Sequence, residues 1–345
     1  MLNKTQELVY PYPGIPAPGA ATELENGIFW MSLPLPFAMG QINVWLLEDG
    51  DGWTLVDTGP AIPECQSIWN TLLNAHLRGR PIQRIFVTHH HPDHVGLARW
   101  LSDRFSCDVY LSRETADKVT FLLQDDISYY EAAVSQFYRA HGICEPAAFV
   151  EFETGRKYRR IVSGSPERMR YLEDGDTLEV GGRAWRVLLC NGHARGHAAL
   201  YCDTAGVLIS GDQILPKITS NISLFSMESE TNPLAEYFAS LQRLRTLPGT
   251  TLVLPSHGRV FSGLHLRIDQ IEQDHHARLT QVESFCDRPR DAAEISSLLF
   301  PRQLNELNRL LALGETLAHL RFLESERRVQ GTTSDERIVY SRLPG

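Results

Sequence analysis

Short apolar runs, separated by polar or glycine-containing turns, mark the first part of the chain. Residues 28–33, 42–48 and 53–57 are rich in β-branched, aromatic and leucine side chains, a composition typical of strands. The sequence Asp49-Gly-Asp-Gly52 lies between the second and third runs and predicts a hairpin turn. The chain is therefore predicted to start with antiparallel strands.

Further along, apolar runs alternate with segments whose apolar residues recur every three or four positions. That spacing corresponds to one face of a helix. We expect helices near residues 62–77 and 234–244 and one after residue 94, and strands at residues 85–88, 109–111, 185–190, 198–202, 207–210 and 252–254. Hairpins followed by alternating strands and helices predict a mixed α and β fold.

Residues 115–167 interrupt this alternation and are predicted to form a helical insertion. Its apolar positions are three or four residues apart and predict one amphipathic helix: Val119, Leu122, Leu123, Ile127, Tyr130, Val134 and Phe137. This helix either packs on the body of the protein or forms a lid over a substrate pocket. The candidate lid residues are Phe121, Tyr129, Tyr130, Phe137 and Tyr138. The basic run at residues 156–160 is either a solvated face or a receptor for an anionic substrate tail.

Residues 263–345 differ in character and are predicted to form a second domain. A linking helix at residues 268–285 is rich in polar side chains, and His275 and His276 are predicted to face solvent there. Pro289 ends this helix, and Asp291 with a glutamate three residues later is typical of a helix start. The pattern then predicts helices at residues 304–311 and 315–324 and a two-stranded wing that includes residues 337–340.

Composition limits the class of protein. The 345 residues are 43% hydrophobic and 22% charged, which predicts a globular chain of about two domains. A net charge of −9 argues against a general affinity for nucleic acid, although a local basic groove is not excluded. Six scattered cysteines without a Cys-x-x-Cys pair predict reduced thiols and a cytoplasmic location. The sequence contains no apolar stretch long enough to predict a membrane-spanning helix.

A dense group of metal-binding side chains follows the strand predicted at residues 85–88. His89, His91, Asp93 and His94 fall within six residues. Residues two apart in an extended segment point the same way, so His89 and His91 can face one metal. Pro92 then marks a turn, after which Asp93 and His94 can face a different point. The loop therefore suits two neighbouring metal sites better than one.

Three later residues have the same placement. His193, Asp212 and His257 each follow an apolar strand candidate, with a glycine nearby that permits a tight turn. His197 also follows a glycine, so the residues alone leave either His193 or His197 as the ligand. His90 is predicted to point away from its two neighbours by strand alternation.

Together these residues resemble the metallo-β-lactamase fold superfamily, on its glyoxalase II-like branch. The resemblance covers roughly residues 20–262 and implies an α+β fold, an αββα sandwich. Residues 1–19, which are rich in proline and glycine from residue 10 onwards, are predicted to form an N-terminal strap. Residues 263–345 resemble the winged-helix appendage of some proteins with this fold. The resemblance implies a first metal bound by His89, His91 and His193, a second bound by Asp93, His94 and His257, and Asp212 as the bridge. It favours His193 as the ligand and places His197 behind the site, with Asp57 orienting a ligand imidazole.

The implied chemistry is hydrolysis. Nitrogen and carboxylate ligands without thiolate favour two Zn²⁺ ions, although iron or manganese also fits. Two such ions hold a bridging hydroxide that attacks a carbonyl, and Asp93 would act as the catalytic group that relays a proton. We expect a small-molecule ester, thioester or lactone as substrate, and a homodimer is possible. The alternatives are a phosphodiesterase or RNA nuclease that uses the winged-helix-like domain, and a non-catalytic sensor.

Overall fold

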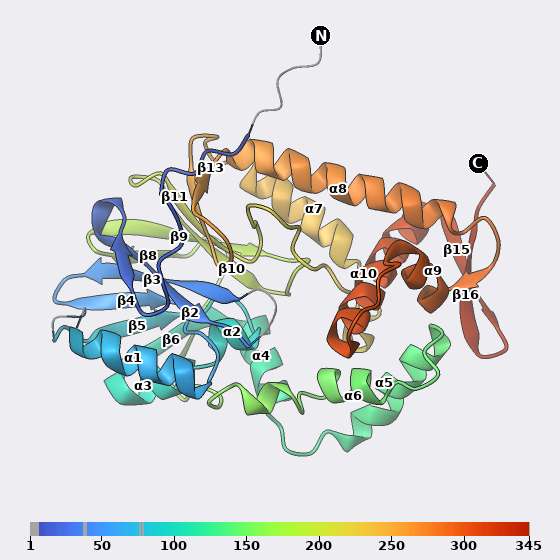
Figure 1. The fold of residues 1–345 in the computed structure, drawn as a ribbon, viewed down its shortest axis with the longest axis horizontal. Helices are drawn as coiled ribbons and strands as arrows, with labels where there is room; N and C mark the ends of the chain where they lie inside the picture. Colours follow the sequence, from blue (N-terminus) through green and yellow to red (C-terminus); the bar gives the residue numbers. More distant parts are fainter. Residues whose placement is uncertain (1–6, 37–39, 76, 78, 345) are drawn as a thin grey trace, which may run out of the picture.

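Two sheets pack face to face in the computed structural model, which describes residues 7–36, 40–75, 77 and 79–344 (Figure 1). The first sheet contains, in spatial order, β1 (Ala21–Glu23), β2 (Ile28–Pro34), β3 (Gln41–Asp49), β4 (Gly52–Val56), β5 (Ile82–Phe86), β6 (Asp108–Ser112) and β7 (Met169–Leu172). The second contains β13 (Phe261–Ser262), β12 (Leu252–Pro255), β11 (Val207–Gly211), β10 (His197–Cys202), β9 (Arg183–Cys190) and β8 (Thr177–Val180). The first six residues of the predicted strap lie outside the described residues.

Strand alternation divides the apolar residues between two faces of each sheet. Trp30, Trp45 and Phe86 point to the core between the sheets, where they meet Trp185 and Leu200 of the second sheet. The outer face of the first sheet packs against α1 (Pro63–Ala75) and α3 (Ala98–Phe105), and the outer face of the second packs against α7 (Pro233–Leu244) and α8 (Leu264–Ser284). Helices therefore cover both outer faces, and the predicted αββα sandwich is confirmed. The hairpin at residues 49–52 is also confirmed, since Asp49 pairs with Gly52.

The predicted single helix in the insertion is wrong. The segment instead contains α4 (Arg113–Leu122), α5 (Ser128–Ala140), α6 (Ala147–Glu153) and a 3-10 turn (Tyr158–Arg160). At the start of α5, the Asp126 carboxylate accepts hydrogen bonds from the Ser128 amide, at 3.0 Å, and hydroxyl, at 2.7 Å. Val119 packs in the outer core of the first sheet, whereas Val134 packs in the core of the second.

The C-terminal region is a set of helices and a small sheet. It contains α9 (Ala292–Leu299), α10 (Glu306–Ser325), β14 (Arg290–Asp291), β15 (Val329–Ser334) and β16 (Arg337–Arg342), with β16 in the middle of the three strands. The capping box at Asp291 and Glu294 is confirmed. The predicted two-stranded wing corresponds to β15 and β16, which pair antiparallel. The likeness to a winged helix as such stays a prediction.

Two expectations for this region are corrected. The helices predicted at residues 304–311 and 315–324 are one helix, α10, which runs through Gly314. His275 does not face solvent but is fully buried, because α10 packs across that face of α8. His276, the next residue, is exposed as expected.

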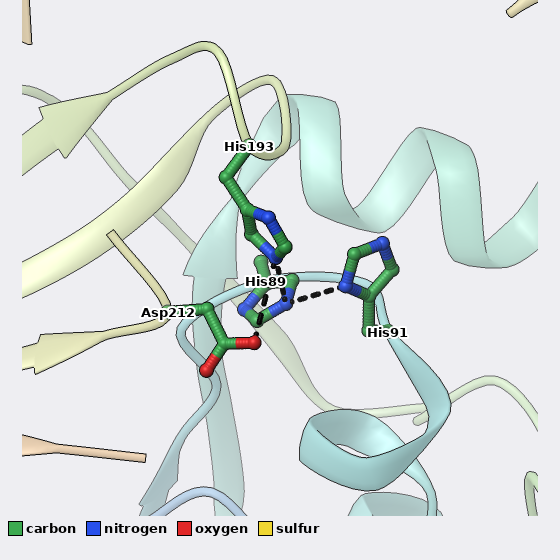
Figure 2. A group of neighbouring side chains, drawn as sticks. All are labelled: His89, His91, His193 and Asp212. Atoms are coloured by element: carbon green, nitrogen blue, oxygen red, sulfur yellow. Dashed lines mark hydrogen bonds and ion pairs between the residues drawn. The ribbon is translucent and has the colours of Figure 1, made fainter. Parts of the chain in front are cut away.

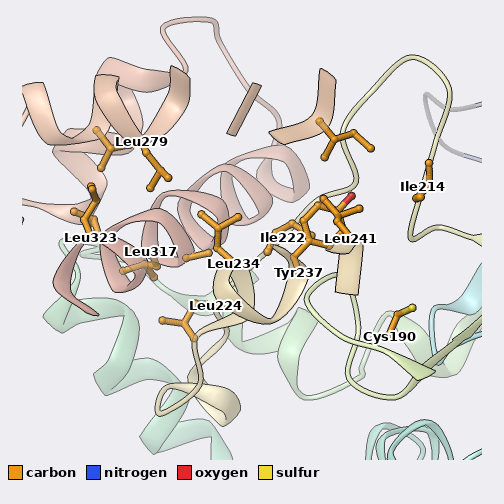
Figure 3. Packing of buried hydrophobic residues seen from close by; sticks show 14 of the residues in the cluster. Cys190, Ile214, Ile222, Leu224, Leu234, Tyr237, Leu241, Leu279, Leu317 and Leu323 are labelled. Carbon is orange, nitrogen blue, oxygen red and sulfur yellow. The ribbon is translucent and has the colours of Figure 1, made fainter. Parts of the chain in front are cut away.

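One apolar core joins the second sheet to the C-terminal region. Leu234 and Tyr237 of α7, Leu279 of α8 and Leu317 of α10 belong to this core (Figure 3). The helices that cover the second sheet therefore also carry the C-terminal region. Among the described residues, no helix is long and apolar enough to cross a membrane.

Candidate metal centre

The seven predicted ligands lie at one edge of the sandwich, where strands of both sheets end. His89 and His91 follow β5, and Asp93 and His94 lie in the short helix α2 (Pro92–Val95). The remaining three residues follow strands of the second sheet, namely His193 after β9, Asp212 after β11 and His257 after β12. Residues up to 168 positions apart in the chain, from His89 to His257, thus meet in two adjoining clusters.

The first cluster contains His89, His91, His193 and Asp212 (Figure 2). Nε2 of His89 lies 2.8 Å from Nδ1 of His91 and 3.3 Å from Nε2 of His193. Nε2 of His193 lies 3.5 Å from Oδ2 of Asp212. The four candidate ligand atoms all lie within 4.8 Å of one another, so a single cation can reach all of them.

The second cluster contains Asp93, His94 and His257. Oδ2 of Asp93 lies 3.6 Å from Nε2 of His94 and 3.3 Å from Nε2 of His257. Oδ1 of Asp212 lies 3.6 Å and 3.5 Å from the same two nitrogens. Asp212 therefore directs one carboxylate oxygen at each cluster.

Three buried polar atoms between these side chains have no hydrogen-bond partner among the described residues, namely Nε2 of His94, Nε2 of His257 and Oδ1 of Asp212. Buried polar atoms are almost always paired, and leaving one unpaired costs about 1–3 kcal/mol. All three face the same space and all are good ligand atoms for a divalent cation. The residues present thus fit a cation at this point.

Hydrogen bonds to the opposite ring nitrogens orient these imidazoles. The Nδ1 atom of His94 lies 2.7 Å from Oδ2 of Asp57, while Nδ1 of His193 and of His257 lie 2.9 Å and 3.1 Å from the carbonyl oxygens of Asn221 and Gln41. Each contact directs Nε2 towards the cluster, as is usual for histidines that bind metals. Asp57 thus lies where its predicted orienting role requires.

The titration of the two clusters differs. Burial and the neighbouring His193 lower the pKa of His91 to about 3, and burial also holds the pKa of His89 well below its ordinary value. Burial opposes protonation of His257 too, but the carboxylates of Asp212 and Asp93 outweigh it and raise the pKa to about 10. Burial likewise opposes ionisation of Asp93, yet His94 and His257 lower its pKa to about 2.

His197 and His90 lie next to the centre but belong to neither cluster. Nε2 of His197 accepts a hydrogen bond of 3.1 Å from the backbone amide of Asp212, and its ring stacks on His89 with centroids 5.0 Å apart. A Cβ at Gly211 would lie 2.3 Å from that nitrogen, so the close approach requires glycine. The carbonyl oxygen of His90 accepts a hydrogen bond of 2.7 Å from the Tyr158 hydroxyl, which brings the insertion next to the histidine loop.

Sequence reasoning missed several residues that support the centre. Asn221 and Gln41 act through backbone carbonyl oxygens, which every residue type possesses, so no sequence signal distinguishes them. Ser220 donates from its hydroxyl to the carbonyl oxygen of Asp212. The sequence marks Thr88 only as the end of a strand, although its amide and hydroxyl both donate to Asp57.

Comparisons with known proteins agree with this arrangement. A family model described as the metallo-beta-lactamase superfamily matches residues 38–257, and one described as a metallo-beta-lactamase-like C-terminal domain matches residues 279–343. Among curated proteins, the probable metallo-hydrolase YqjP of Bacillus subtilis (strain 168) is 29% identical over 90% of this chain and 96% of its own length. A hydroxyacylglutathione hydrolase of Serratia proteamaculans (strain 568) is 26% identical over 83% of this chain and 93% of its own length.

Two solved structures resemble the whole chain. A beta-lactamase domain protein from Burkholderia ambifaria has a TM-score of 0.87 and 38% identity, covering 97% of this chain and 98% of its own. A metallo-beta-lactamase family protein from Thermus thermophilus has a TM-score of 0.79 and 31% identity, covering 92% of this chain and 99% of its own. The likeness therefore includes the C-terminal region as well as the sandwich.

Proposed function

The chain belongs to the metallo-beta-lactamase superfamily and is a metallo-hydrolase, and from that premise we propose that it uses two divalent cations to cleave a small ester, thioester or lactone. The histidine and aspartate clusters suggest divalent metal binding. The two-cation assignment and the substrate class are the parts that go beyond the family.

The observation that carries the proposal is the position of Asp212. Its Oδ2 faces His193 of the first cluster, while its buried Oδ1, without a hydrogen bond from any described residue, faces His94 and His257 of the second. A carboxylate that binds a single cation would not need the ligand atoms of a second cluster next to its other oxygen. We therefore assign Asp212 as the bridge between two cations.

The proposed ligands divide accordingly. The first cation would be held by His89, His91 and His193, the second by Asp93, His94 and His257, and both by Asp212. All ligand atoms are imidazole nitrogens or carboxylate oxygens, and no described thiolate is among them. This set suits zinc best, while iron and manganese also accept it.

When bound, two such cations would ionise a shared water molecule near neutral pH and polarise the carbonyl that it attacks. The chain contributes orientation and proton transfer. Asp93 lies beside both His94 and His257, where its carboxylate would hold the attacking water and relay a proton to the leaving group. Asp57, Asn221 and Gln41 keep the ligand imidazoles in one orientation.

An acyl substrate is supported by the relatives named hydroxyacylglutathione hydrolases, since an acyl-glutathione is a thioester. Part of the basic run at residues 156–160, the candidate receptor for an anionic substrate tail, is already paired. Arg156 pairs with Glu131 and Glu151, and Lys157 lies 3.8 Å from Glu306.

Nucleic acid is a poorer substrate class for this chain. The C-terminal region would have to supply a basic surface, but many of its arginines are already paired with carboxylates. These pairs are Arg278–Glu315, Arg328–Glu283, Arg337–Asp291 and Arg342–Glu283. They support the acyl hydrolase over the nuclease, and RNA belongs in the test as the competing outcome.

The test compares the variant Asp212→Asn with the matched control Asp203→Asn, which changes an exposed aspartate in the turn between β10 and β11. Both are assayed for metal content and for hydrolysis of acyl-thioesters, lactones, a β-lactam and single-stranded RNA. We expect Asp212→Asn to bind two fewer metal equivalents than the wild type and to lose at least about 10²-fold of its thioester or lactone turnover. Unchanged metal content with full activity would refute the proposal, as would turnover of RNA alone.

A further inference from the structure

A third group of ligand side chains lies away from the candidate centre, between α8 and α10. His275 of α8 and Glu315 and His319 of α10 are buried, and one ligand atom from each lies within 4.8 Å of the other two. Glu315 and His319 are four residues apart on the helix, so their side chains lie on one face. The proposed hydrolase chemistry uses none of these residues.

The spacing of the two imidazoles matches a shared cation. Nδ1 of His275 lies 3.2 Å from Nε2 of His319. Two nitrogens bound tetrahedrally to one zinc, each at about 2.0–2.1 Å, lie about 3.3–3.4 Å apart. The two ring centroids lie 5.3 Å apart, with the rings tilted by 30°.

His319 carries the hydrogen-bond arrangement of a metal ligand. Its Nδ1 donates to the carbonyl oxygen of Glu315 at 2.7 Å, which fixes the proton on Nδ1 and leaves the Nε2 lone pair facing His275. The same type of contact orients His193 and His257 in the candidate centre.

His275 occupies a buried position. Its side chain has no exposed surface, and the nitrogen that faces His319 is Nδ1. The rings of Tyr237 and Phe238 lie 5.6 Å and 5.9 Å from the His275 ring, edge to face.

Arg278 competes with a cation for this place. Its guanidinium forms an ion pair with Oε1 of Glu315. The pair neutralises the buried carboxylate when no cation is present, and Oε2 is the oxygen that a cation would use. Removing the guanidinium should therefore strengthen cation binding.

We propose that His275, Glu315 and His319 form a third cation site, which takes Zn²⁺ or a similar first-row divalent ion and fastens α10 to α8. The site is separate from the candidate centre and does not take part in hydrolysis. Helix α10 also supports the segment that holds His193, since the amide of Leu224 donates to the carbonyl oxygen of Gly314 at 3.0 Å. The cation would therefore stabilise the whole C-terminal side of the protein.

The experiment measures zinc equivalents by equilibrium dialysis of the full chain followed by elemental analysis. We expect the wild type to bind one equivalent more than His319→Gln and Glu315→Gln. The matched control His276→Gln changes the exposed neighbour of His275 and should keep every equivalent. Asp212→Asn should lose the equivalents of the candidate centre and keep the third, which separates this inference from the proposed function.

Arg278→Gln gives the opposite readout, because it should bind the third equivalent more tightly than the wild type. Far-UV circular dichroism checks that each variant is folded. If His319→Gln does not fold, the result for Glu315→Gln decides the test, because that substitution preserves side-chain size. Equal zinc content in the wild type and Glu315→Gln, together with no gain in Arg278→Gln, would overturn the site. The cluster would then be only a buried histidine pair beside an ion pair.

Discussion

Asp57 connects several parts of the metal centre through one buried carboxylate. It accepts hydrogen bonds from the amide of Thr88 at 2.8 Å and from the Thr88 hydroxyl, and its Oδ2 lies 2.7 Å from Nδ1 of His94. Its backbone is left-handed, with φ of 61°, which places the side chain under the histidine loop. Asparagine and aspartate tolerate this conformation better than most residues do.

The variant Asp57→Asn therefore removes the charge with little change in backbone strain. We expect the second cation to bind about 10–100-fold more weakly, because His94 loses the carboxylate that orients it. Competition with a chromophoric chelator measures this affinity. The control Asp49→Asn changes another buried aspartate of the first sheet, bonded to Thr54 and remote from the centre. Equal affinities in the two variants would contradict the role given to Asp57.

Metal binding should release protons at neutral pH. In the metal-free protein the pKa of His257 is raised to about 10, and the carboxylates around His94, Asp57 foremost, raise its pKa well above the ordinary value despite burial. Both rings are therefore protonated at pH 7 and must lose a proton before they bind a cation. The apparent affinity should rise with pH and level off only near pH 10.

Calorimetry in buffers of different protonation enthalpy measures this release directly. The observed enthalpy of zinc binding at pH 7 should vary with the protonation enthalpy of the buffer. The slope of the first quantity against the second gives the number of protons exchanged, and it should correspond to net proton release. In the variant His257→Ala the slope should fall by about one proton. A slope of zero in the wild type would show that these histidines are already neutral.

At the scale of the elements, helix α10 shows what a sequence pattern leaves out. Two helices were predicted, at residues 304–311 and 315–324, but Gly314 lies in the middle of one continuous helix. A Cβ at this position would lie 2.7 Å from Oγ and 2.8 Å from Cβ of Ser223. The glycine is therefore explained by a close approach of another segment, which depends on the tertiary structure.

The variant Gly314→Ala tests that explanation. Alanine favours an isolated helix by about 1 kcal/mol, yet overpacking costs about 1–3 kcal/mol, so we expect a net loss of unfolding free energy. Urea denaturation measures the change. The second substitution Ser223→Gly removes the opposing side chain and should recover the loss. A more stable Gly314→Ala protein would mean that the segment at Ser223 moves aside freely.

Other elements were predictable in proportion to their burial. The strands that became β3, β4 and β9 carry long apolar runs and were found from the sequence. The edge strands β7 and β8 were missed because they are only four residues long and each has a single buried residue. His275 was misplaced for a related reason: a polar stretch of α8 suggests solvent, and only the packing of α10 buries it.

At the scale of the whole molecule, the sequence indicated the ligands because their chemistry is rare and each follows a strand. The resemblance implied Asp212 as the bridge, but which of its oxygens faces each cluster depends on the packing of the two sheets. The sequence also could not indicate the carbonyl oxygens of Asn221 and Gln41. The domain boundary near residue 263, the winged-helix likeness and a homodimer stay predictions.

The central claim is that two cations share the Asp212 carboxylate, and anomalous scattering from crystals of the zinc-loaded protein tests it most directly. Data collected on both sides of the zinc absorption edge should show two peaks about 3.5–4 Å apart, one on each side of that carboxylate. His89, His91 and His193 should surround one peak, and Asp93, His94 and His257 the other. A single peak at these clusters, or two peaks without Asp212 between them, would contradict the account.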